Sequence, residues 1–182
     1  MARIPYFDPA TATGPLAETY KKLPPLNIFR MMGHAGPMMD KFVKLGNQIL
    51  IFSDLDPVLR EIAIVRVGVL SKASYEVYQH EAICRKYGMS EEKIKAIHEG
   101  PEAAAFNELE RLVMRFTDDV VANVRACDAT FKPLVEKLGF QQTQHLVMAI
   151  GYYMMVSRFL ETFDVDIEED GRPAGLKLPG MG

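Results

Sequence analysis

The stretch LDPVLREIAIVRVGVLSKASYEVYQHEAICRKYG, residues 55–88, decides the fold. Ser53, Asp54 and Asp56 each suit the cap of a helix, and Pro57 suits its first turn. The apolar run that follows is rich in β-branched residues, which also favour a strand. A helix is preferred because the run continues a capped start and no hairpin signal follows it. A helix that is apolar on most sides is expected to be buried.

A second helix is predicted after a short break near Lys72 to Ser74, and it ends at Gly88, a typical C-cap. The two helices are expected to fold back on each other as an αα-hairpin. Outside this pair, apolar residues recur with a helical period, and no alternating strand pattern with an Asn-Gly or Asp-Gly turn is found. The sequence therefore predicts an all-α fold, a compact domain of about seven to eight helices.

The chain has 182 residues, enough for one domain with a substantial core. Residues 1–14 are rich in Pro, Ala, Thr and Gly and are predicted to form an N-terminal arm. Residues 15–165 are predicted to form the helical domain, and residues 166–182 a C-terminal tail. Helices are expected within 15–23, 24–36, 37–52, 53–72, 71–88, 90–100, 101–126, 128–139 and 141–163.

Composition and charge exclude several classes of function. The formal net charge is -3 and the basic residues are scattered, so no nucleic-acid or anionic-membrane surface is predicted. No apolar run reaches the ~18 residues that a membrane-spanning helix requires, and the N-terminus lacks the pattern of a signal peptide. Cys84 and Cys127 lie far apart and form no CxxC pair. They indicate reduced thiols in a cytoplasmic protein.

The second helix holds a row of reactive side chains. Glu76, His80 and Cys84 follow one another at intervals of four, which places them on one helix face, although an ordinary helix surface also produces such rows. Glu61, on the preceding helix, lies within possible reach of His80. A glutamate beside a histidine makes a proton relay, because the carboxylate orients the ring and stabilises its charged form. One histidine and two acids can also bind zinc, but without HExxH or a second clustered histidine no metal is predicted.

The stretch from residue 55 onward resembles the core of the carboxymuconolactone decarboxylase family, which includes the alkylhydroperoxidase D (AhpD) group. The similarity covers roughly residues 20–165, and its specific part is an L-R-E start, an apolar helix, then H-x7-G followed by Ser-x-x-x-Ile. It implies a compact helical fold and a homo-oligomer, a trimer or a hexamer. The hydroperoxidase group carries a CxxC pair where this chain has Ala73 and Glu76. Glu61 and His80 match the family's proton-relay acid and histidine.

The resemblance therefore implies a branch without the redox pair. We expect a lyase of the decarboxylase type that needs no cofactor and acts on a small carboxylated or lactone-like metabolite. Its catalytic residues would be Glu61, His80 and Glu76. Arg66 or Arg158 would bind a substrate carboxylate, with Tyr75 beside the site. Two alternatives stay open, a thiol-dependent peroxidase that uses Cys84 or Cys127 and a non-catalytic oligomeric binding protein.

Overall fold

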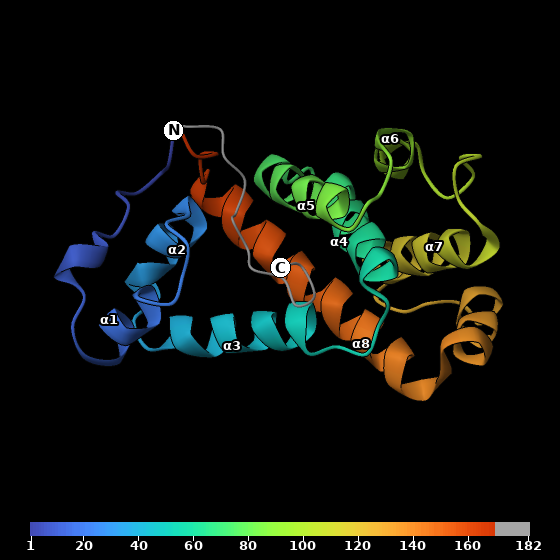
Figure 1. Cartoon of the computed structure of the whole chain (residues 1–182), viewed down its shortest axis with the longest axis horizontal. Helices are drawn as coiled ribbons and strands as arrows, with labels where there is room; N and C mark the ends of the chain where they lie inside the picture. The colour runs from blue at the N-terminus through green and yellow to red at the C-terminus, as the bar shows by residue number, and fades with distance from the viewer. Residues whose placement is uncertain (170–182) are drawn as a thin grey trace. The chain divides into compact units, whose positions relative to one another are not determined.

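The structure is a computed structural model that describes residues 1–169 (Figure 1). Residues 170–182, most of the predicted C-terminal tail, lie outside the described residues. The described part contains no strand, which confirms the all-α prediction. Its α-helices are Gly14–Tyr20 (α1), Asn27–Met32 (α2), Met38–Ile51 (α3), Pro57–Ser71 (α4), Ser74–Lys86 (α5), Glu91–Glu99 (α6), Glu108–Asn123 (α7) and Asp128–Phe163 (α8), with short 3-10 turns at Pro9–Thr11 (η1) and Gly33–Ala35 (η2).

The chain divides into two compact units. The first joins Met1–Phe52 to the end of the chain from Phe159, and the second is Ser53–Arg158. In the first unit, the N-terminal arm is held by backbone hydrogen bonds from Arg3 N–H to Phe163 O at 3.0 Å and from Phe7 N–H to Arg30 O at 3.1 Å. The predicted arm is thus anchored within its own unit.

In the second unit, α4 packs against α5, α6 and α7. Asp56 is the residue that caps α4, because its carboxylate accepts hydrogen bonds from the N–H groups of Val58 and Leu59 at 2.9 and 3.1 Å. Every residue from Leu59 to Gly68 is buried, as expected for a helix apolar on most sides. The β-branched run is therefore helical because a capped start and burial on all faces outweigh its strand propensity.

The bounds of one helix differ from those expected, and one expected break lies inside a continuous element. The helix predicted within 101–126 begins only at Glu108, because Asn107 and Glu110 form a capping box there. Within α8 the helical backbone is interrupted at Gly139, whose φ of 71° is readily adopted by glycine, and Pro133 lies inside the helix. The expected pair of helices, 128–139 and 141–163, corresponds to the two parts of α8.

None of the helices in the described part of the chain is long and apolar enough to cross a membrane.

Candidate acid–base site

Four charged side chains gather where α4 and α5 meet in the second unit. Arg60 and Glu61 lie near the start of α4, and Glu76 and His80 lie one turn apart on α5. The two helices approach closely at Gly68, where a Cβ atom would lie 3.0 Å from a side-chain carbon of α5. Because Gly68 has no side chain, α4 and α5 pack closely together. This close packing brings Glu61 of α4 and Glu76 of α5 within reach of His80.

His80 lies between the two carboxylates. Its Nδ1 is 2.7 Å from Glu61 Oε2, and its Nε2 is 3.0 Å from Glu76 Oε1. The contact with Glu61 is a hydrogen bond, and the contact with Glu76 is an ion pair. The three side chains are nearly inaccessible, with exposed fractions of 0% for Glu61, 3% for Glu76 and 6% for His80. The predicted contact between Glu61 and His80 is therefore present.

Two neighbouring carboxylates determine the charge of His80. Burial alone lowers the pKa of the ring, but the negative charges of Glu76 and Glu61, and its hydrogen-bonding contacts with them, raise it to about 10. His80 is therefore an imidazolium near neutral pH and carries a proton on each ring nitrogen. In this state the histidine is a proton donor, and the carboxylates are the bases.

Arg60 completes the charge balance of the cluster. Its Nε and Nη2 donate to Glu61 Oε1 at 3.2 and 3.1 Å, and Nη2 also donates to the hydroxyl of Tyr87 at 3.3 Å. Arg60 is 3% exposed. Two cations, Arg60 and His80, thus match two carboxylates, Glu61 and Glu76, and buried charges are tolerated in such pairs. Arg60 is not among the site residues that the sequence predicts.

Tyr153 of α8 contacts the histidine and Tyr152 contacts Tyr153, and neither tyrosine is among the predicted site residues. The ring of Tyr153 meets His80 edge-on, with centroids 4.8 Å apart, and it contacts Tyr152 in the same way at 5.2 Å. Burial, reinforced by the negative charge of Glu76, raises the pKa of each phenol, so both tyrosines stay protonated. Some 70 residues separate them from His80 (80 to 152 and 153). No local spacing signal reports a contact over that distance.

Arg66, predicted to bind a substrate carboxylate, lies in a different set of contacts. Its Nε and Nη2 donate to the two carboxylate oxygens of Asp118 at 2.7 and 2.9 Å, and Nη1 donates to the carbonyl of Ile97 at 3.1 Å. These contacts join α4 to α6 and α7. They use all three nitrogens of the guanidinium, so its geometry is that of a structural clamp.

Arg158 and Tyr75, the other two predicted substrate-binding residues, differ in their exposure and contacts. Arg158 is exposed and donates from Nη1 to the carbonyl of Met154, one turn earlier in its own helix, at 2.8 Å. Tyr75 is buried beside Glu76 in sequence, with 2% of its surface exposed.

The two cysteines differ sharply in environment. Cys84 is completely buried in an apolar cluster with Ile62, Val65 and Met114. This burial raises the pKa of its thiol, and Glu61 and Glu81 add to the shift, so the reactive thiolate is disfavoured. Cys127 is exposed at the start of α8.

No group of three or more His, Cys, Asp and Glu side chains suited to a metal ion occurs within residues 1–169. His80 is not suited to bind a metal ion in this state, because both of its ring nitrogens face carboxylates and offer no free lone pair.

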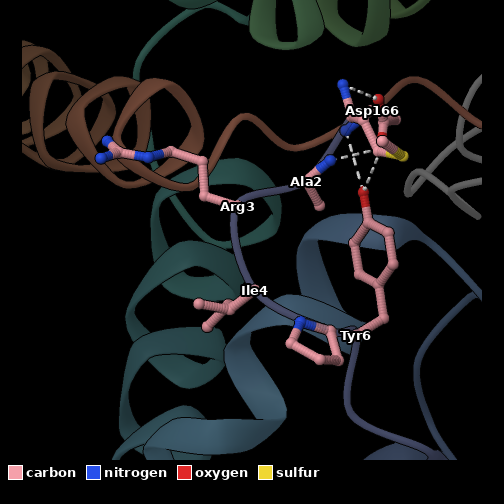
Figure 2. Close-up of a pocket in the computed structure, with 7 residues that line it drawn as sticks. Ala2, Arg3, Ile4, Tyr6 and Asp166 are labelled. Atoms are coloured by element: carbon pink, nitrogen blue, oxygen red, sulfur yellow. Dashed lines mark hydrogen bonds and ion pairs between the residues drawn. The ribbon is translucent and has the colours of Figure 1, made fainter.

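A cavity of about 370 Å³ lies in the first unit and contains none of the predicted site residues. Figure 2 shows Tyr6 and Ala2 converging on Asp166, whose carboxylate accepts from the Tyr6 hydroxyl at 3.2 Å and from Ala2 N–H at 3.0 Å. Arg3 points away from Asp166 and donates to Thr162 O at 3.0 Å. These polar groups satisfy one another, so the contacts anchor the arm. The cavity is lined by Met1, Ala2, Arg3, Ile4, Pro5, Tyr6 and Asp166.

Solved structures with the same fold carry different names. An AhpD-core, peroxidase-related protein from Ralstonia eutropha JMP134 has a TM-score of 0.78 and 19% identity, over 93% of this chain and 94% of that chain. A protein of unknown function from Agrobacterium tumefaciens, described as an AhpD antioxidant defence protein, has a TM-score of 0.71 and 20% identity over 75% and 94%. The debrominase Bmp8, solved with 2,3,4-tribromopyrrole, has a TM-score of 0.70 and 18% identity over 80% and 78%.

At these identities the structures establish the fold alone. No curated protein matches the chain in sequence. The model of the carboxymuconolactone decarboxylase family matches residues 37–119, a segment that contains Arg60, Glu61, Glu76 and His80. Over residues 37–119 the chain is therefore similar to the carboxymuconolactone decarboxylase family, and its fold is that of the AhpD-like structures.

Proposed function

We propose that this protein is a cofactor-independent acid–base enzyme of the lyase type, acting on a small carboxylated or lactone-like metabolite. The observation that carries the proposal is the position of His80, buried between Glu61 Oε2 at 2.7 Å and Glu76 Oε1 at 3.0 Å. A buried carboxylate–imidazolium–carboxylate row stores one mobile proton between two bases, which is what proton transfer to or from carbon requires.

We assign a separate role to each of the three residues. Glu61 is held by Arg60 and orients the ring through Nδ1, so it is a positioning residue. Glu76 would be the group that meets the substrate, and His80 would supply its proton through Nε2. In a decarboxylation, the bond between carbon and the carboxylate breaks and CO2 leaves. The electron pair stays on the substrate as an enolate. The proton of His80 then reaches that carbon through Glu76, and the relay regains a proton from water.

The peroxidase alternative receives less support from the geometry. A thiol peroxidase needs a thiolate that reaches the peroxide and a second thiol or reductant that resolves the sulfenic acid. Cys84 is buried with a raised pKa, and the positions of the family's CxxC pair hold Ala73 and Glu76. A homo-oligomer, a trimer or hexamer, and a cytoplasmic location remain part of this proposal.

The proposal is tested with small carboxylated lactones, by measuring CO2 release and deuterium incorporation from D2O by NMR. We expect His80→Gln to lower turnover by roughly 10²–10⁴-fold, the usual contribution of a general acid or base. His98→Gln is the matched control, because His98 is a half-exposed histidine whose Nε2 contacts Glu81 at 2.8 Å. Unchanged turnover in His80→Gln would overturn the proposal. A wild type that neither releases CO2 nor exchanges deuterium would support the non-catalytic alternative instead.

A further inference from the structure

One face of α8 in the second unit carries exposed apolar side chains. At about 3.6 residues per turn, its members fall within an arc of about 100° around the helix axis. The exposed fractions are 80%, 43%, 50% and 47% for Phe140, Val147, Met148 and Met155, and Gly151 is exposed among them. These five residues form the apolar stripe. Tyr153, which contacts His80, lies about 200° around the helix from Gly151, so the apolar stripe is separate from the acid–base site.

The apolar stripe has no charge along its length but is flanked by charge at both ends. No Asp, Glu, Lys or Arg occurs from residue 140 to residue 157. At the first end, the exposed carboxylate of Asp54 accepts a hydrogen bond from Gln141. At the second end, Arg158 is exposed. Contiguous exposed apolar surface with a polar rim is typical of a protein interaction site.

The apolar stripe is complementary to a second copy of itself. In an antiparallel contact with a two-fold axis at Gly151, positions equally far before and after this glycine face each other. Val147 of one copy then meets Met155 of the other, and Gln144 meets Arg158, which brings the basic end to the acidic end. A parallel contact would place Arg158 against Arg158. A Cβ atom at Gly151 would meet nothing within 4 Å in its own chain, so the two helices can approach closely there.

We propose that the apolar stripe of α8 is a two-fold interface on which a second copy of this chain packs, antiparallel and crossing at Gly151. Its methionines suit such a contact, because their side chains adapt to the opposing surface. This inference deepens the homo-oligomer part of the proposed function. A two-fold contact requires an even number of copies, which a hexamer has and a trimer lacks.

Analytical ultracentrifugation of the full-length protein measures the particle mass. We expect Met155→Glu to halve the wild-type mass, because it places an unpaired carboxylate on each half of an apolar contact. Val124→Glu is the matched control and should keep the wild-type mass, since Val124 is 89% exposed but lies at the end of α7. A wild type with one or three subunits, an unchanged mass in Met155→Glu, or an equal fall in Val124→Glu would overturn the inference.

Cross-linking tests the same contact with a variant that leaves the apolar side chains in place. In a Cys127→Ser background the remaining thiol, Cys84, is fully buried, and Gly151→Cys adds one thiol per copy beside the axis. A short bis-maleimide should convert most of this protein to a covalent dimer on a denaturing gel. Lys95→Cys, exposed on α6, is the control and should run as a monomer.

A monomeric band for Gly151→Cys, the result expected if another part of the same chain covers the apolar stripe, would overturn the inference. Circular dichroism melts verify that each variant folds. Neither experiment uses a substrate. The acid–base proposal can therefore fail in the turnover assay while the interface stands, and the interface can fail while the acid–base proposal stands.

Discussion

Arg60 and Glu61, neighbours in α4, form a buried ion pair in which Arg60 Nε and Nη2 donate to Glu61 Oε1 at 3.2 and 3.1 Å. The other oxygen of Glu61 bonds to His80 at 2.7 Å. Neighbouring residues on a helix point in different directions, so this contact requires the long arginine side chain to fold back. The carboxylate of Glu61 thus contacts both Arg60, which is always charged, and His80, whose charge depends on pH.

Removing Arg60 is expected to destabilise the protein strongly. Arg60→Met leaves the 0%-exposed carboxylate of Glu61 without its permanent counter-charge, and breaking a buried pair in this way costs about 3–5 kcal/mol. Urea unfolding measures the change. Arg85→Met is the control, since Arg85 pairs with Glu91 and Glu81 at the surface, and such pairs contribute only about 0–1 kcal/mol. Equal losses of unfolding free energy in Arg60→Met and Arg85→Met would contradict the expectation that the buried Arg60 pair contributes more than the surface Arg85 pairs.

The sequence was sufficient for the helices and for placing Glu76 and His80 on one face, because caps, periodicity and i,i+4 spacing are local properties. It left the contact of Glu61 with His80 open, because the two residues lie 19 positions apart on different helices. The sequence could not place Tyr153, because its contact with His80 depends on how a distant helix packs. Nor could it foresee that Arg66 would meet Asp118 instead of a substrate, since an arginine pattern alone does not identify its partner.

Cysteine labelling is expected to separate the two thiols. Cys127 is exposed and Cys84 is fully buried with a raised pKa, and alkylation requires an accessible thiolate. Mass spectrometry after brief maleimide treatment should detect one adduct on the native protein, at Cys127, and two adducts in denaturant. Cys127→Ser should leave the native protein unlabelled. Rapid native labelling of Cys84 would revive the thiol-peroxidase alternative.

Arg66 and Asp118 are expected to behave as a structural pair. In a double-mutant cycle with Arg66→Met and Asp118→Asn, the coupling energy from urea unfolding should be on the order of 1–3 kcal/mol, because the contact is bidentate and partly buried. If Arg66 instead binds substrate, folded Arg66→Lys would raise KM with little loss of stability. We expect the opposite, a clear loss of stability and an unchanged KM.

The free energy of unfolding is expected to fall as the pH rises from about 6.5 towards 10. The pKa of His80 is raised from 6.5 to about 10 in the folded protein, so the folded state retains a proton that the unfolded chain releases. The stabilisation is complete below pH 6.5 and is lost as the pH passes through the folded value. The groups that face the ring are Glu61, Glu76 and Tyr153. Tyr153 stays protonated over this range because its pKa is raised well above the usual value.

Urea unfolding of the wild type and of His80→Gln at several pH values isolates the contribution of His80 protonation to the free energy of unfolding. The raised pKa of Cys84 adds a slope of the same sign above about pH 8.5, the usual thiol value, but it does so in both proteins. The difference between the two free energies of unfolding should therefore narrow from about pH 6.5, where His80 loses its proton in the unfolded chain, to about pH 10, where it loses its proton in the folded protein. Glu76→Gln should weaken the dependence, because it removes one of the two charges that hold the proton. A constant difference from pH 6 to 10 would show that His80 is not the stored imidazolium that the relay requires.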